Sequence, residues 1–263
     1  MDMYEWVDPL RFLLCLLFLL IASIYDIRTR EVPNWIWAVF APTGLALTLT
    51  SLVLGGWSYP RITMLVISAF LTICLSLALF YIGMFGGADA KALMCLAAAM
   101  PIYPEKFELT ANLLLPMPPI STFNNAVLAA SLLTFVISFR NLIDLIKHKG
   151  RIFEGLEKER LVKKIAAFIT GFRVDAEKIR DEKHHYILLE EFSMGENGKL
   201  IRRLKILRSL NAEEREEKLI PKELGGKVWV TMGLPFLVFI MLGFLTSFLF
   251  GDIIFWLITA AAR

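Results

Sequence analysis

Two aspartates end apolar runs in this chain, and a pair of carboxylates can carry out hydrolysis. Asp26 follows the uncharged run 12–25, and Asp89 follows the uncharged run 62–88. An ionisable group inside or at the end of a membrane span is energetically costly, which makes it a candidate functional group. Two carboxylates that share one proton can accept a proton from water and donate one to a carbonyl oxygen. The pair therefore predicts aspartic peptide hydrolysis.

Small residues lie directly before the second aspartate. Gly86, Gly87 and Ala88 precede Asp89 and leave almost no side-chain bulk there. Glycine allows a substrate backbone to approach closely, and it also allows helices to pack tightly in lipid. We expect these three residues to shape the site around Asp89.

The elements that position the aspartates must be membrane helices. The chain is 57% hydrophobic, with a mean hydropathy of +0.61. The runs without Asp, Glu, Lys or Arg are 12–25, 32–60, 62–88, 92–104, 109–139 and 228–251. A spanning helix needs about 20 apolar residues, which the second, third, fifth and sixth runs provide. The first can extend back to Arg11, whose side chain would reach the interface. The fourth spans only if its helix starts near Asp89. We therefore predict a polytopic all-α membrane protein with six transmembrane helices.

A charged segment separates the fifth and sixth predicted helices. Residues 147–227 are rich in both basic and acidic side chains, with a basic excess, and they predict a small cytoplasmic α+β domain with an antiparallel sheet. The expected elements are a helix over Leu156–Thr170, a hairpin of His184–Phe192 with Leu200–Leu207 around the turn 195–198, and further strands at Phe172–Ile179 and Lys218–Pro221. The predicted division is thus a membrane domain over 1–146, a soluble domain over 147–227 and a last helix within 228–263.

Counting crossings places both aspartates at one face of the membrane. Two predicted spans lie between Asp26 and Asp89, and an even number of crossings returns the chain to the same side. The joints on that side carry more Lys and Arg than the opposite joints, which favours the cytoplasm for the aspartates. Both termini of this multi-pass membrane protein would then lie outside. Residues 1–8 carry acids and no base, which is not typical of a cleavable signal peptide.

The two motifs together resemble those of a known family. Asp26 is followed by a short basic loop and by Pro33-Asn34, and Asp89 ends a Gly-x-Gly-Asp-like motif. This arrangement is similar to that of the type IV prepilin peptidase group. The length, the six predicted spans and the late cytoplasmic segment match its archaeal branch, the preflagellin (prearchaellin) peptidases.

The resemblance implies a GxGD-type aspartic endopeptidase. Such an enzyme removes short basic leader peptides from preflagellins and pilin-like precursors at the cytoplasmic face. Asp26 and Asp89 would be the catalytic pair, Gly86 and Gly87 would be the glycine segment, and Ala88 replaces the second glycine of the motif. The connection 27–32 is short and lacks the Cys-x-x-Cys loop of bacterial relatives. We therefore expect no metal, no cofactor and no N-methyltransferase activity, with the precursor protein and the lipid bilayer as partners and no nucleic acid.

Two other functions use the same carboxylates. Tyr25-Asp26 with Gly-x-x-Asp also resembles presenilin and signal-peptide-peptidase-like proteases, although no Pro-Ala-Leu motif follows. A proton- or cation-coupled transporter could use Asp26, Asp89 and Asp144, although the sequence shows no internal repeat.

Two further side chains near the motifs have simpler interpretations. We expect Lys91 to be an interface anchor. We expect Asp144 to pair with Arg140, one helical turn before it.

Overall fold

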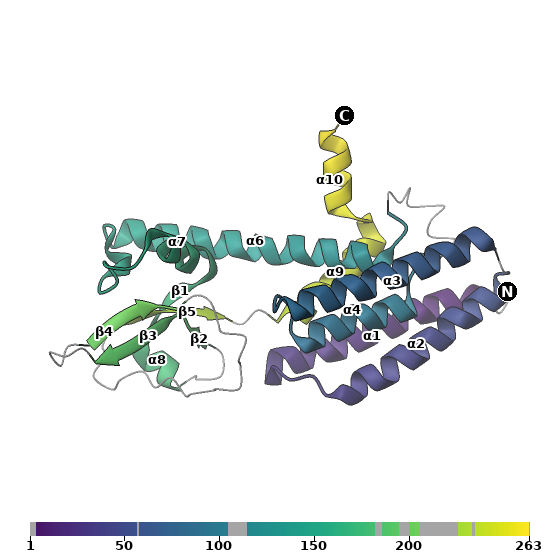
Figure 1. Cartoon of the computed structure of the whole chain (residues 1–263), viewed down its shortest axis with the longest axis horizontal. Helices are drawn as coiled ribbons and strands as arrows, with labels where there is room; N and C mark the ends of the chain where they lie inside the picture. The colour runs from purple at the N-terminus through teal and green to yellow at the C-terminus, as the bar shows by residue number, and fades with distance from the viewer. Residues whose placement is uncertain are drawn as a thin grey trace. The chain divides into compact units, whose positions relative to one another are not determined.

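The computed structural model describes residues 4–56, 58–104, 115–181, 186–194, 200–205, 226–232 and 235–262. The chain forms two compact units (Figure 1). Unit 1 comprises Met1–Ala130 and Pro235–Arg263, and unit 2 comprises Ser131–Leu234.

Unit 1 is helical. Its helices are α1 (Tyr4–Thr29), α2 (Asn34–Leu54), α3 (Tyr59–Tyr81), α4 (Gly87–Ala99), the first part of α6 (Pro118–Lys147), α9 (Phe236–Phe250) and α10 (Ile253–Ala261). Helices α1, α2, α3 and α6 are long and apolar enough to cross a membrane. Helices α9 and α10 are bent by 55° at a short break and provide a fifth candidate if they form one span. The protein is therefore mostly helical with four or five candidate spans among the described residues, and a total of six spans remains a prediction.

The fourth predicted span forms as α4, a central helix of 13 residues. At about 1.5 Å per residue it is close to 20 Å long, less than the roughly 30 Å of a hydrocarbon core. It is buried on most sides and packs against α1, α2, α3 and α9. Its buried side chains include Ala90, Ala92, Leu93, Cys95, Leu96 and Ala99. A helix that is apolar all round is typically enclosed by other helices, and the neighbours of α4 enclose it in this way.

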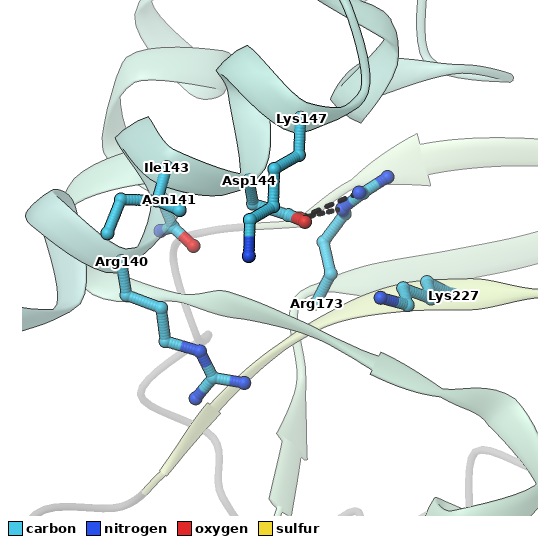
Figure 2. Close-up of a pocket in the computed structure, with 7 residues that line it drawn as sticks. All are labelled: Arg140, Asn141, Ile143, Asp144, Lys147, Arg173 and Lys227. Carbon is cyan, nitrogen blue, oxygen red and sulfur yellow. Dashed lines mark hydrogen bonds and ion pairs between the residues drawn. The ribbon is translucent and has the colours of Figure 1, made fainter.

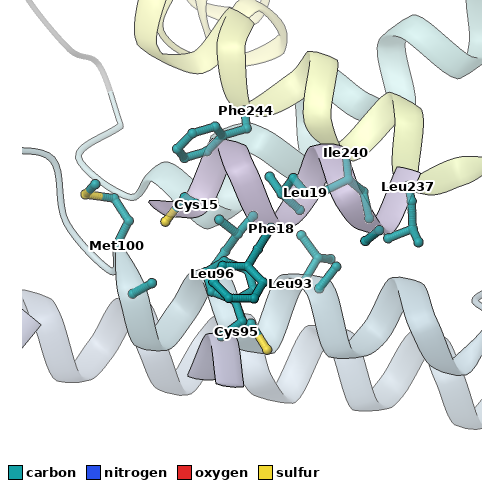
Figure 3. Close-up of a cluster of buried hydrophobic side chains, with 14 of the residues drawn as sticks. Cys15, Phe18, Leu19, Leu93, Cys95, Leu96, Met100, Leu237, Ile240 and Phe244 are labelled. Atoms are coloured by element: carbon teal, nitrogen blue, oxygen red, sulfur yellow. The ribbon is translucent and has the colours of Figure 1, made fainter. Parts of the chain in front are cut away.

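The core of unit 1 joins α4 to α1 and α9. Figure 3 shows Leu93 and Leu96 of α4 facing Phe18 and Leu19 of α1, with Phe244 of α9 nearby. Leu19, Leu93 and Phe244 are fully buried. Lipid tails are as apolar as Leu, so it is the close van der Waals packing of such side chains that favours their burial between membrane helices. The position of α4 is therefore fixed mainly by close packing.

Arg11 does not reach the interface, so this part of the prediction is wrong. Its side chain is 2% exposed, and its Nε donates to the carbonyl oxygen of Ala99 at 3.0 Å. Its Nη1 donates to Asp8 at 2.9 Å, in an ion pair within α1. The start of α1 therefore meets the end of α4, and the two helices run antiparallel. The partner carboxylate and carbonyl make burial of the guanidinium tolerable.

Unit 2 contains two antiparallel sheets. Its elements after α6 are a 3-10 turn at Arg151–Phe153, α7 (Leu161–Thr170), β1 (Phe172–Asp175), α8 (Ala176–Asp181), β2 (Tyr186–Leu188), β3 (Glu190–Met194), β4 (Leu200–Leu204) and β5 (Lys227–Met232). One sheet has the order β1-β5-β2, and the other pairs β3 with β4. Glu190 pairs with Leu204, and Met194 pairs with Leu200. This register agrees with only part of the predicted hairpin. Its first predicted strand, His184–Phe192, is divided in the structure, because β2 pairs with β5 in the larger sheet and only β3 pairs with β4. The predicted turn at 195–198 lies outside the described residues.

Several predicted elements differ from the observed ones. The amphipathic helix begins at Leu161 and not at Leu156. The predicted strand at Phe172–Ile179 ends at Asp175, where α8 begins. The predicted strand at Lys218–Pro221 lies outside the described residues.

The last predicted helix also begins later than expected. Residues 227–232 form β5, the central strand of the larger sheet, and α9 starts only at Phe236. Val228, Trp229 and Val230 are apolar and fully buried in unit 2. Hydropathy alone joins them to the following helix, although β-branched and aromatic residues also favour strands.

Candidate active site

Asp26 lies one turn before the end of α1. Helix α1 ends at Thr29, and Arg30 follows with a positive φ of 59°. The hydroxyl of Thr29 donates to the carbonyl oxygen of Glu31 at 2.8 Å, which helps to order this turn. Asp26 is half-buried, and the charge of Arg30 acts on its carboxylate. The carboxylate therefore lies at a helix end beside a basic loop.

Asp89 lies in the first turn of α4. Gly86 precedes the helix, and its backbone N–H donates to Oδ2 of Asp89 at 3.1 Å. The carboxylate thus caps the N-terminus of its own helix, where the helix dipole favours a negative charge. Asp89 is half-buried, and Ala88 packs against the core of unit 1.

The structure brings the two aspartates to the same end of unit 1. Because α1 and α4 run antiparallel, the end of α1 meets the start of α4. The charge of Asp26 acts on Asp89, so the carboxylates are near enough to interact electrostatically. No hydrogen bond joins these two carboxylates, both of which are in the described part of the chain. The arrangement offers two partly accessible carboxylates at one site.

The start of α9 completes the surroundings of both motifs. The backbone amide of Leu237, in the first turn of α9, is near enough to act electrostatically on the carboxylate of Asp26. The neighbouring Phe236 ring lies 5.0 Å from the Phe85 ring, which belongs to the segment before Asp89. A helix start carries unpaired N–H groups and a partial positive charge. Asp89 therefore lies at the start of its own helix, whereas Asp26 lies in the last turn of α1 and is near the start of α9.

The sequence reasoning missed this role of α9. Pro235 marks a helix start there, because proline is favoured at that position. Its distance in sequence from Asp26 gave no indication that the two segments meet.

A hydrogen bond links the two sequence motifs directly. Lys91, predicted to be an interface anchor, donates from Nζ to Oδ1 of Asn34 at 2.7 Å. Asn34 is the first residue of α2, directly after Pro33. Thus Pro33-Asn34 marks a helix start and also contacts the segment that carries Asp89.

Asp144 belongs to unit 2. Its Oδ2 accepts hydrogen bonds from Nε and Nη2 of Arg173 at 2.9 and 2.7 Å. Arg140 instead lies over the Phe172 ring, with 4.9 Å from Cζ to the ring centroid. The predicted pairing of Asp144 with Arg140 is therefore wrong, because strand β1 supplies a closer arginine.

No metal-binding cluster accompanies the aspartates. Among the described residues, no three His, Cys, Asp or Glu side chains lie close enough together to hold a metal ion.

Comparisons with known proteins match nearly the whole chain. Residues 13–139 match the model described as the type IV leader peptidase family, and residues 163–253 match the archaeal peptidase A24 C-terminus, type II. The chain is 31% identical to the preflagellin peptidase of Methanococcus voltae, over 90% of this chain and 93% of that protein. It is 29% identical to the preflagellin peptidase of Methanococcus maripaludis, over 89% of this chain and 92% of that protein. It is 26% identical to the preflagellin peptidase of Methanocaldococcus jannaschii, over 89% of this chain and 91% of that protein.

Proposed function

Since this chain belongs to the type IV leader peptidase family, we propose that it is a membrane aspartic endopeptidase. Its substrate is a preflagellin or pilin-like precursor, from which it removes the short basic leader peptide. Asp26 and Asp89 are its catalytic residues, and Gly86, Gly87 and Ala88 shape the site.

One observation carries this proposal: Asp26 and Asp89 lie at the same end of unit 1. The charge of one carboxylate acts on the other, and both remain partly exposed. Each lies beside a helix start, so backbone N–H groups can hold an ionised carboxylate in place. A transporter site is typically near the bilayer midplane, whereas Asp26 and Asp89 lie at the ends of α1 and α4.

The chemistry follows from sharing one proton between the two groups. The ionised carboxylate takes a proton from water while the oxygen of that water attacks the scissile carbonyl carbon. The protonated carboxyl donates its proton to the carbonyl oxygen, which gives a neutral tetrahedral diol. The diol collapses when the C–N bond breaks: the leaving nitrogen takes a proton from the protonated carboxyl, and a diol hydroxyl returns a proton to the other carboxylate, which gives the new carboxylic acid end. Water is thereby added across the peptide bond, and the pair regains its single proton.

The surroundings of the aspartates support cleavage at the cytoplasmic face. Arg28, Arg30 and Lys91 lie at the same helix ends as the aspartates. An excess of Lys and Arg favours the cytoplasmic side for such ends. The glycines beside Asp89 leave space for an extended substrate backbone.

A cleavage assay tests the proposal. Purified protein is mixed with a preflagellin precursor, and mass spectrometry follows the loss of the leader. Asp26→Asn and Asp89→Asn should each lower the rate by at least about a hundredfold, since acid–base catalysis contributes that much or more.

Asp175→Asn provides the matched control, because Asp175 is exposed at the end of β1 in unit 2. It should cleave at the wild-type rate. Wild-type activity in either of the other two variants, with folding unchanged, would contradict the aspartic mechanism. Cleavage of an ordinary transmembrane helix at an equal rate would instead indicate a presenilin-like specificity.

A further inference from the structure

Unit 2 contains a pocket lined mainly by basic side chains. Its volume is about 170 Å³, and its lining residues are Arg140, Asn141, Ile143, Asp144, Lys147, Arg173 and Lys227. Figure 2 shows the Lys147 amine directed from α6 and the Lys227 amine directed from β5 toward the space between helix and strands. A water molecule needs only about 10–15 Å³ of such volume, so a phosphate-sized group can enter.

The one acid in this lining is already engaged. Oδ2 of Asp144 accepts two hydrogen bonds from Arg173, and its Oδ1 lies 3.0 Å from Nδ1 of His148. The ion pair holds the Arg173 side chain, which is only 10% exposed, against the wall of the pocket.

The other cations of the pocket lack such a partner. In the part of the chain that the structure describes, neither the Lys147 nor the Lys227 amine has a hydrogen bond or an ion pair. Arg140 rests on the face of Phe172, an interaction that leaves its N–H groups available to an anion. The pocket therefore has an excess of positive charge that no described acid neutralises.

The position of these residues along α6 points to the headgroup region of a bilayer. Residues 118–139 of α6 contain no Asp, Glu, Lys or Arg and are long enough to cross the hydrocarbon core. Arg140, Asp144 and Lys147 follow within the last turns of the same helix. These charges therefore lie where a spanning helix leaves the hydrocarbon.

An exposed apolar face lies beside the charged one on the same turns. Phe139, Ile143 and Ile146 are 64%, 41% and 70% exposed. Their spacing of four and then three residues places them along one side of the helix. Such a pairing of an apolar face with a basic face is typical of helices at a membrane interface.

We propose that this pocket binds the phosphate group of an anionic lipid headgroup. Arginine recognises phosphate oxygens with paired N–H groups, and lysine contributes a mobile point charge. Basic pockets beside membrane helices bind such headgroups, and the apolar face formed by Phe139, Ile143 and Ile146 can lie against the acyl chains. Free inorganic phosphate has the same charged group but has no chain for that face. Lipid binding at this pocket does not depend on the proposed proteolysis.

Native mass spectrometry of the full-length protein tests this proposal. Delipidated protein in a neutral detergent is titrated with dioleoyl phosphatidylglycerol, with dioleoyl phosphatidylcholine, and with inorganic phosphate. We expect saturable binding of phosphatidylglycerol with clear preference over phosphatidylcholine. The double variant Lys147→Ala/Lys227→Ala should weaken it about 25-fold, because each basic residue near an anionic headgroup contributes about a factor of five.

The double variant Lys158→Ala/Lys178→Ala provides a matched control. It removes the same charge from exposed positions of unit 2 outside the pocket. The control should bind as the wild type does, and Lys147→Arg/Lys227→Arg should retain most of the affinity. Equal weakening in both alanine variants, or equal binding of the two lipids, would overturn the proposal. Competition by inorganic phosphate at the concentrations at which phosphatidylglycerol binds would assign the pocket to free phosphate instead.

Discussion

The charged side chains at the two ends of unit 1 differ in burial and in the number of their hydrogen bonds. At what we call the arginine end, Asp8 and Arg11 of α1 meet Ser51 of α2 and Ala99 of α4. Arg11 is buried and donates to Asp8 and Ala99, while the hydroxyl of Ser51 donates to Asp8 at 3.0 Å. Thr48 of α2 adds hydrogen bonds to Ala98 and Ala99 at 2.9 and 2.8 Å. Three helices are thus held together by polar contacts at this end.

The aspartate end, formed by Asp26, Asp89 and their neighbours, has fewer constraints. Asp89 accepts one backbone hydrogen bond from Gly86, and the amide of Leu237 acts on Asp26. Both carboxylates stay partly exposed, and Gly86 is exposed beside them.

This difference suggests that the arginine end mainly stabilises the fold and that the aspartate end mainly serves the reaction. Buried and hydrogen-bonded polar groups fix the position of helices, whereas sites that admit a substrate need accessible groups. Helices α1 and α4 both run from the arginine end to the aspartate end. Contacts at the arginine end can therefore fix how far α1 is shifted along α4, and so the relative position of the two aspartates, while the surroundings of the aspartates stay accessible. Variants at the two ends should therefore affect different measured quantities.

The largest expected effect on stability is at Arg11. Arg11→Met removes a buried cation and leaves the carboxylate of Asp8 without its charge partner. Breaking a buried pair on one side costs about 3–5 kcal/mol. The free energy of unfolding should fall by this amount in a denaturant titration in mixed micelles, while molecules that remain folded keep their cleavage activity.

Arg28→Met is the matched control on the same helix. Arg28 is exposed in the last turn of α1, where a cation contributes at most about 1 kcal/mol through the helix dipole. An equal loss of stability in the two variants would show that the arginine end has no special role.

A smaller loss of stability is expected at Thr48. Thr48→Val keeps the shape of the side chain but removes the hydroxyl that donates to the last carbonyls of α4. Buried acceptors left without a donor cost about 1–3 kcal/mol, and Ala99 keeps its bond from Arg11, so we expect about 1–2 kcal/mol. The melting temperature in detergent measures this change, and Thr48→Ser should retain most of the stability. A Thr48→Val protein as stable as the wild type would show that the Thr48 hydroxyl does not stabilise the arginine end.

The local parts of the site could be predicted from sequence. Asp89 with Gly86-Gly87-Ala88 is a contiguous motif, so the contact between Gly86 and Asp89 needs no tertiary information. An even number of predicted crossings between Asp26 and Asp89 indicated that they lie near each other at one end of the helices, and α2 and α3 are both long apolar helices. Periodicity and hydropathy are sufficient for features of this kind.

The parts that depend on distant contacts could not be predicted. Hydropathy treats Arg11 as a group that must reach water, because it cannot show that Asp8, Ser51 and Ala99 surround it. It likewise joins the buried strand β5 to α9, and so it gives no sign that Leu237 lies beside Asp26. Apart from Asp8, which is three residues before Arg11, the partners are distant in sequence, and only tertiary packing decides the outcome.

At the aspartate end, Gly86 should affect activity more than stability. A Cβ atom at Gly86 would lie 3.1 Å from Oδ2 of Asp89, so the carboxylate must move by a few tenths of an ångström. The backbone itself is not strained, since φ of Gly86 is −69°. Gly86→Ala should lower kcat/KM about tenfold, equivalent to about 1.4 kcal/mol, while the melting temperature is unchanged or rises slightly.

Gly87→Ala gives the comparison for this variant. Its added Cβ would meet only the Phe80 ring at 3.7 Å, an ordinary contact, so the loss of activity should be smaller. If Gly87→Ala lowered kcat/KM more than Gly86→Ala does, the role of Gly86 would not be to leave space beside the Asp89 carboxylate.

The smallest effect is expected for the hydrogen bond between Lys91 and Asn34. The bond is short, at 2.7 Å, but it is exposed, so water can replace it. Lys91→Met and Asn34→Ala should each reduce stability by less than about 1 kcal/mol, with a coupling energy near 0.5 kcal/mol in a double-mutant cycle. The same cycle measured on kcat/KM separates two roles, because a bond that positions α4 relative to α2 couples in activity as well. Coupling in stability alone would make it a structural contact, and coupling in activity would extend the site from the aspartates to the start of α2.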